Sequence, residues 1–123
     1  MQSFAFRWIQ VAVVYFIIAL CWGIVMSATM SFDLKTIHVH VNLLGWVSMT
    51  LFGVVYHLWP KLSEGLVPKV QFWLHQIGTP VMLIALTFYL RGNKALEPVI
   101  ALGSLLVLIS ALLFAFRVLF GKK

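Results

Sequence analysis

The stretch that decides the fold of this chain is IHVHVNLLGWVSMTLFGVVYHLW, which occupies residues Ile37–Trp59. No Asp, Glu, Lys or Arg interrupts it, and it is longer than the roughly 20 apolar residues that a helix needs to cross a bilayer. Outward from it lie comparable apolar runs at Arg7–Thr29, Lys69–Leu90 and Leu96–Phe120. The chain therefore contains four predicted transmembrane segments.

Composition supports a membrane protein. The chain has 123 residues, of which 63% are hydrophobic and only 10% are charged, whereas a soluble domain carries about 25% charged residues. Lipid offers no hydrogen-bond partners, so continuous spans of this kind must be helices, which satisfy their own backbone groups. We expect an all-α membrane protein in which residues 1–123 form one domain, with the four helices in an antiparallel bundle or arc.

The positions of the charged residues predict the orientation. The net charge of +6 comes from residues at the ends of the spans, which indicates a bilayer rather than a nucleic-acid partner. Cytoplasmic loops are enriched in Lys and Arg, and one side holds more of them than the other. The richer side has Arg7, Lys61, Lys69, Arg117, Lys122 and Lys123, and the other has Lys35, Arg91 and Lys94. Both termini are thus predicted in the cytoplasm.

Prolines mark the ends of helices, and the cysteine count limits cross-linking. Pro60 lacks an amide hydrogen and is expected to end the second helix, while Pro98 fits the first turn of the fourth. Pro80 lies inside the third span and frees the carbonyl of Gln76, which predicts a kink. Cys21 is the single cysteine, so no intrachain disulfide is possible, and we expect a buried thiol. The first span is too long for a secretory signal and is expected to be a retained helix.

Four histidines are the candidates for chemistry. The chain has no glycine-rich phosphate loop, paired cysteines, paired carboxylates or serine nucleophile motif, so hydrolytic and nucleotide chemistry are not supported. Ionisable side chains inside a membrane are costly, and each is a site hypothesis. The candidates are His38, His40, His57 and His75.

Helix geometry limits which histidines can cooperate. His38 and His40 differ by about 200° around a helix, so they cannot readily share one metal. His40 and His57 lie roughly 25 Å apart along one helix, and His75 is expected level with Gly53, roughly 20 Å from His40. Two axial nitrogens of one iron lie only about 4 Å apart. His40 therefore needs a partner from another chain.

His57 and His75 are expected within roughly 6 Å in depth and could form a second site. Simpler roles remain open for His38, His40 and His57. His38 and His40 can hydrogen-bond to headgroups or loop carbonyls, and the imidazole of His57 can reach interfacial water.

The second predicted helix resembles a segment of a known protein family. The runs HVHVNLLGW (His38–Trp46) and GVVYHLWP (Gly53–Pro60) resemble the second helix of the catalytic subunit of haem-copper oxidases, especially the nitric oxide reductase branch. The run FWLHQIG (Phe72–Gly78) is similar to segments of the same superfamily, more weakly. The resemblance implies that His40 is an axial ligand of a low-spin haem.

The resemblance also implies an assembly. The family subunit has twelve helices with pseudo-threefold symmetry, so a four-helix chain corresponds to one third of it. A closed homotrimer could hold haem b between His40 of one copy and His38 of its neighbour. The copper ligands and redox tyrosine of the family have no recognisable counterparts here. Two histidine ligands leave iron no open position, which favours electron transfer over catalysis.

Other functions remain open. The chain could bind or sense haem, nitric oxide or copper without turnover, through a single histidine ligand. It could also be a cofactor-free assembly factor or small transporter whose histidines relay protons. A redox partner protein is expected for an electron carrier, and a quinone could bind near Trp73, His75 and Gln76.

Overall fold

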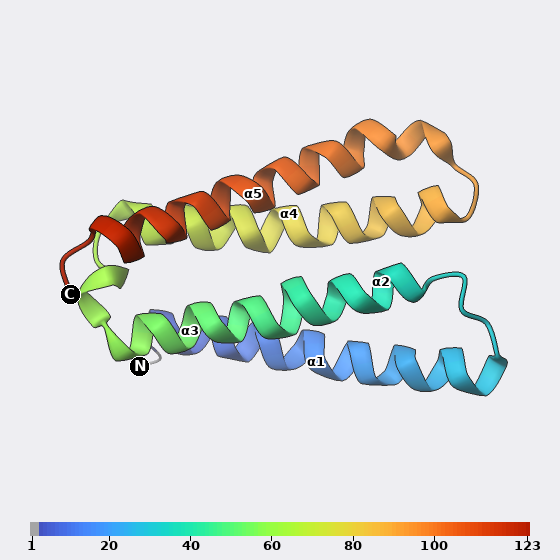
Figure 1. The fold of residues 1–123 in the computed structure, drawn as a ribbon, viewed down its shortest axis with the longest axis horizontal. Coiled ribbons are helices and arrows are strands. Elements are labelled where there is room, and N and C mark those ends of the chain that lie inside the picture. Colours follow the sequence, from blue (N-terminus) through green and yellow to red (C-terminus); the bar gives the residue numbers. More distant parts are fainter. Residues whose placement is uncertain (1–2) are drawn as a thin grey trace.

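The computed structural model describes residues 3–123, and four of its helices are long and apolar enough to cross a membrane. This confirms the all-helical class and the number of spans. The second span consists of three consecutive pieces, of which the middle one is a π-helix (Figure 1). In chain order the elements are α1 (Phe4–Thr29), α2 (Lys35–His40), the π-helix η1 (Val41–Val47), α3 (Ser48–Leu58), the 3-10 turn η2 (Pro60–Ser63), α4 (Leu66–Leu90), the 3-10 turn η3 (Lys94–Leu96) and α5 (Glu97–Phe120).

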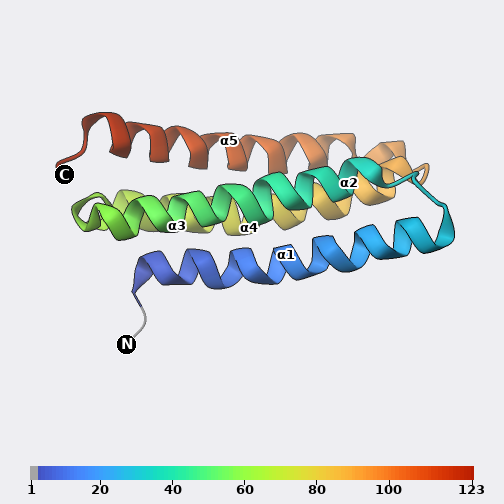
Figure 2. The ribbon, with the colours of Figure 1, turned by 60° about the horizontal axis from the view of Figure 1, so that its bottom comes forward.

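The spans form two antiparallel hairpins. One hairpin is α1 with the second span, and the other is α4 with α5. Figure 2 shows the second span and α4 between α1 and α5. The start of α1, the end of α5 and the turn after α3 lie at one end of the molecule, which we call the terminal end (Figure 1). The loops 30–34 and 91–96 lie at the opposite end, which we call the far end. That the terminal end faces the cytoplasm stays a prediction.

Aromatic side chains from all four spans fill the terminal half of the bundle. The ring of Trp8 is fully buried and lies 4.8 Å from the ring of Phe72 and 5.0 Å from that of Phe52, measured between centroids. Phe52 in turn meets Phe114 at 4.5 Å. Edge-to-face and tilted ring contacts at these distances are favourable. This aromatic core holds the two hairpins together in the terminal half.

Glycines bring the helix backbones close together within each hairpin. A Cβ atom on Gly103 of α5 would lie 2.7 Å from the backbone nitrogen of Met82 in α4. A Cβ atom on Gly53 of α3 would lie 2.9 Å from the carbonyl oxygen of Ala5 in α1. Helices in membranes associate through such small residues, because van der Waals contact replaces the hydrophobic effect there. These positions cannot accept a side chain without a shift of the backbone.

Local signals from the sequence are mostly confirmed. Pro60 follows the end of the second span and begins η2, and Pro98 lies in the first turn of α5. Pro80 lies within α4, which continues through it as one helix. The thiol of Cys21, expected to be buried, is exposed. The expectation was wrong because large apolar side chains also cover the outside of a membrane bundle, so an apolar neighbourhood does not indicate burial.

Candidate functional site

His40 lies at the junction between α2 and the π-helix and is partly buried. Its Nδ1 atom is 2.8 Å from the carbonyl oxygen of Thr36, one turn earlier. A carbonyl oxygen can only accept, so Nδ1 carries the hydrogen and Nε2 keeps its lone pair. Histidines that bind metals are commonly held by such a hydrogen bond from the other ring nitrogen. The ring of His40 is therefore oriented as a metal-binding imidazole would be.

The π-helix begins directly after His40. Its wider register is visible at Ser48, whose backbone N–H donates to the carbonyl of Leu43, five residues earlier. In an α-helix that N–H would donate to Leu44 instead. The carbonyl of Leu44 is thus released from the bond that α-helical register would give it. Single π-helical turns inside α-helices are frequent at functional sites.

The ring of His75 forms a hydrogen bond with this carbonyl of Leu44. This residue of α4 is only 1% exposed, and its Nε2 atom lies 2.9 Å from the carbonyl oxygen of Leu44. The ring is enclosed by those of Trp8 and Phe52, with centroids 5.7 and 5.4 Å away. Nε2 must donate to the carbonyl, so Nδ1 is the acceptor nitrogen, and it has no partner among residues 3–123. His75 therefore links α4 to the π-helix across the bundle.

His57 and His75 are not brought together. His57 is exposed near the terminal end, whereas His75 is buried and its Nε2 atom bonds to the carbonyl of Leu44. The expected level of His75 was Gly53, and its ring does pack against that of the adjacent Phe52, with centroids 5.4 Å apart. The two imidazoles therefore differ in burial and in partners and do not form one site in this chain.

His38 has a different environment from His40. Its ring lies over Gly23 of α1, where a Cβ atom would be only 3.1 Å from the His38 Cε1 atom. Its Nε2 atom is 3.5 Å from the side-chain nitrogen of Asn42, and its Nδ1 atom is buried without a partner among the described residues. In the single chain, His38 therefore faces its own first helix rather than a neighbouring copy.

An apolar groove of about 480 Å³ lies beside His38, toward the far end. Its walls come from α1 and the start of the second span, with Thr87 from α4. Ligand pockets commonly have volumes of about 300–1,000 Å³. The lining residues are Ile17, Ile18, Ala19, Cys21, Trp22, Val25, Leu34, Ile37, His38, Val41 and Thr87.

The other suggested sites are not assembled within one chain. No group of three or more His, Cys, Asp or Glu residues in 3–123 could hold a metal ion, so copper has no ready ligand set there. Trp73 is 62% exposed, His75 is buried, and the side-chain amide of Gln76 donates to the sulfur of Met49 at 3.5 Å. These three residues do not share a surface, so a quinone pocket near them is not supported.

Sequence reasoning missed three features of the bundle. The π-helix was not predicted, since no residue type marks the change of register reliably. The bond from His75 to a backbone carbonyl also had no sequence signal beyond the presence of a histidine in an apolar span. The buried pair in which the Tyr56 hydroxyl donates to the Gln71 side chain at 3.0 Å was likewise not anticipated.

Comparison with known proteins gives one informative match. No protein-family model and no solved structure match the chain. The curated protein "Cbb3-type cytochrome c oxidase subunit CcoN1" from Stutzerimonas stutzeri is 47% identical over 55 residues, which covers 39% of this chain and 11% of that protein. The chain thus spans about a tenth of the length of this relative. The match supports a relationship to the haem-copper oxidases, while the nitric oxide reductase branch stays a prediction.

Proposed function

We propose that this chain is a haem b-binding membrane protein that transfers electrons and corresponds to one third of a haem-copper oxidase core. The observation that carries the proposal is the hydrogen bond from His40 Nδ1 to the Thr36 carbonyl, which leaves Nε2 free to bind iron. The resemblance also implies that His40 is a haem ligand, and the partial match to an oxidase subunit supports this family relationship.

The surrounding residues would position the ligand. The carbonyl of Thr36 orients the ring of His40, and the π-helix that follows sets the path of the span beyond it. His75 holds that π-helix against α4 through the carbonyl of Leu44. A haem with two nitrogen ligands supplies reversible one-electron chemistry without an open coordination position.

We expect a second ligand from another chain, because His38 lies about 200° from His40 around the same helix and His57 lies about 25 Å along it. A closed ring of three copies is the assembly that we propose, following the pseudo-threefold plan that the resemblance implies. His38 of the neighbouring copy is the candidate second ligand. Its ring rests on Gly23 in the single chain, so this role requires the ring to turn outward on assembly.

The remaining features of the proposal concern location and partners. The excess of Lys and Arg at the terminal end supports both termini in the cytoplasm and the helices in a bacterial inner membrane. Exposed apolar side chains on all four spans would contact lipid and neighbouring copies. A redox partner protein would exchange electrons with the haem.

The test is the visible spectrum of the protein produced with ample haem. We expect a sharp band on reduction that His40→Ala removes and that His57→Ala leaves unchanged. His57 is a suitable control because it is exposed and about 25 Å from His40 along the helix axis. A colourless wild-type protein, or an unchanged band in His40→Ala, would refute the proposal.

A sensor that binds haem or nitric oxide is the second candidate, and one observation favours it. Within a single chain the orientation of His40 provides one imidazole ligand, which would leave a coordination position of the iron open. Titration with carbon monoxide separates the two functions. Rapid, stoichiometric binding would favour the sensor, and no binding would favour the electron carrier.

A further inference from the structure

The apolar groove adjoins a second pocket at the far end of the molecule, which includes charged and polar side chains. The pocket has a volume of about 270 Å³. It shares Trp22 and Val25 with the groove, so the two hollows are neighbours. Its remaining lining comes from Met26, Thr29, Ser31, Asp33 and Arg91. The apolar groove therefore lies next to a pocket with polar groups where the spans end.

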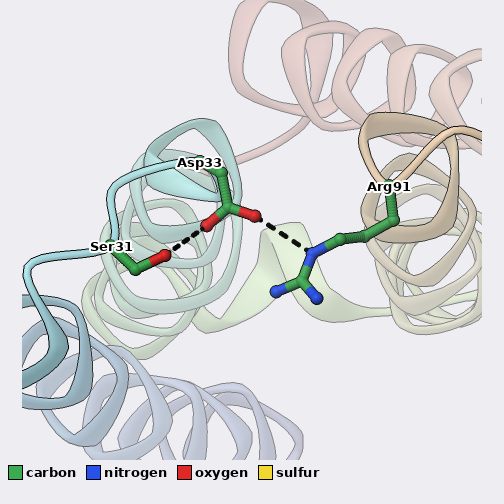
Figure 3. Close-up of polar contacts among 3 residues, drawn as sticks. All are labelled: Ser31, Asp33 and Arg91. Carbon is green, nitrogen blue, oxygen red and sulfur yellow. Dashed lines mark hydrogen bonds and ion pairs between the residues drawn. The ribbon is translucent and has the colours of Figure 1, made fainter.

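Arg91 presents unused donors at this pocket. Its Nε atom pairs with Asp33 at 3.1 Å, and the other carboxylate oxygen of Asp33 accepts from the Ser31 hydroxyl at 2.8 Å (Figure 3). The two terminal nitrogens of the guanidinium point away from the carboxylate in Figure 3 and have no partner among residues 3–123. The ion pair is about half exposed, so these donors are accessible.

The two hollows match the two parts of a phospholipid. The groove offers almost purely apolar walls, which suit an acyl chain, and it ends beside donors that suit a phosphate. Guanidinium groups bind phosphate through paired N–H donors. Thr87 lies in the groove one helical turn before Arg91, so both hollows open on the same side of α4.

We propose that the far end binds a membrane phospholipid, with its phosphate on Arg91 and one acyl chain along the groove between α1, α2 and α4. The lipid would join the two hairpins in the half of the bundle that lies away from the aromatic core. The groove is lined by His38 but not by His40, and lipid binding on Arg91 requires neither residue to hold haem, so the inference does not depend on haem binding.

The experiment is a titration of delipidated, detergent-solubilised protein with phosphatidylglycerol, followed by native mass spectrometry. We expect Arg91→Gln to weaken retention of the lipid about tenfold, because a charge-assisted hydrogen bond to phosphate is lost. Arg7→Gln is the matched control, since it makes the same change at the terminal end. Asp33→Asn breaks the ion pair but keeps the guanidinium, so lipid binding should be retained.

A second pair of variants tests the groove. Cys21→Trp fills it from an exposed lining position, and Ile24→Trp places the same ring on the same helix outside the groove. We expect only Cys21→Trp to displace the lipid. If Arg91→Gln does not fold, the comparison of Cys21→Trp with Ile24→Trp tests lipid binding by itself.

Three results would overturn the inference. The first is equal lipid retention in Arg91→Gln and Arg7→Gln. The second is equal loss in Arg91→Gln and Asp33→Asn, which would mean that the ion pair only shapes the loops. The third is loss of a haem band, and not of lipid, in Cys21→Trp, which would make the groove a haem site. A colourless protein that retains lipid as expected would leave this inference intact while refuting the proposed function.

Discussion

Replacing His75 by Phe tests whether this residue holds the π-helix in place. The substitution keeps an aromatic ring between Trp8 and Phe52 but removes the donor that lies 2.9 Å from the Leu44 carbonyl. A buried carbonyl left without its donor costs about 1–3 kcal/mol. Because the packing changes little, we expect the free energy of unfolding to fall by about 1–3 kcal/mol.

The assay is reversible unfolding in mixed detergent–SDS micelles, followed by tryptophan fluorescence. His75→Gln is the matched variant, because its side-chain amide can donate to the same carbonyl and should recover part of the loss. Amide hydrogen exchange at Val47 and Ser48 should be faster in His75→Phe, since the π-helical register loses its cross-bundle support. Equal stability and equal exchange in wild type and His75→Phe would show that His75 does not hold the π-helix.

Three further outcomes are expected. Gly103→Ala should lower the free energy of unfolding by about 1–3 kcal/mol, because the new Cβ would lie 2.7 Å from a backbone nitrogen of α4. SDS titration measures this, and an unchanged midpoint would show that α4 and α5 can move apart at no cost. Tyr56→Phe should cost about 1 kcal/mol in the same assay, because the Gln71 side-chain oxygen loses its buried donor; a gain in stability would contradict this. The hydroxyl of Ser31, and to a smaller extent the charge of Arg91, hold the pKa of Asp33 below its usual 3.8. The ionised carboxylate therefore stabilises the protein above pH 3.8, and this stabilisation is lost as the pH falls through the lowered pKa. The difference in melting temperature between wild type and Asp33→Asn should therefore be constant from about pH 7 to pH 5 and disappear in stronger acid; a difference that vanishes near neutral pH would refute the assignment.

Much of the fold could be predicted because its signals are local. Length and apolar composition define each span, since a bilayer demands about 20 apolar residues whatever the neighbours are. Pro60 and Pro98 mark helix ends through their own missing amide hydrogens. The candidate status of His40 followed from its place in an apolar span and from the resemblance, and the structure adds the hydrogen bond that orients its ring.

The candidate site needed more than local signals. The pairing of His57 with His75 rested on depth alone, whereas the rotation of each helix leaves His57 exposed and points His75 into the bundle toward Leu44. The position of the His38 ring depends on Gly23, a residue distant in sequence whose missing side chain makes room for the imidazole. Such contacts between helices leave no periodic pattern in one helix alone.

The sequence by itself determined that this is a four-span helical membrane protein with costly histidines inside it, because hydrophobic length and buried charge are properties of each segment. Only the tertiary structure decided that His75 closes a carbonyl released by the π-helix, that Arg91 meets Asp33 across two hairpins, and that the thiol of Cys21 is exposed. These outcomes depend on how helices are rotated and shifted against one another. In lipid, that arrangement is set by side-chain packing and hydrogen bonds rather than by hydrophobic burial.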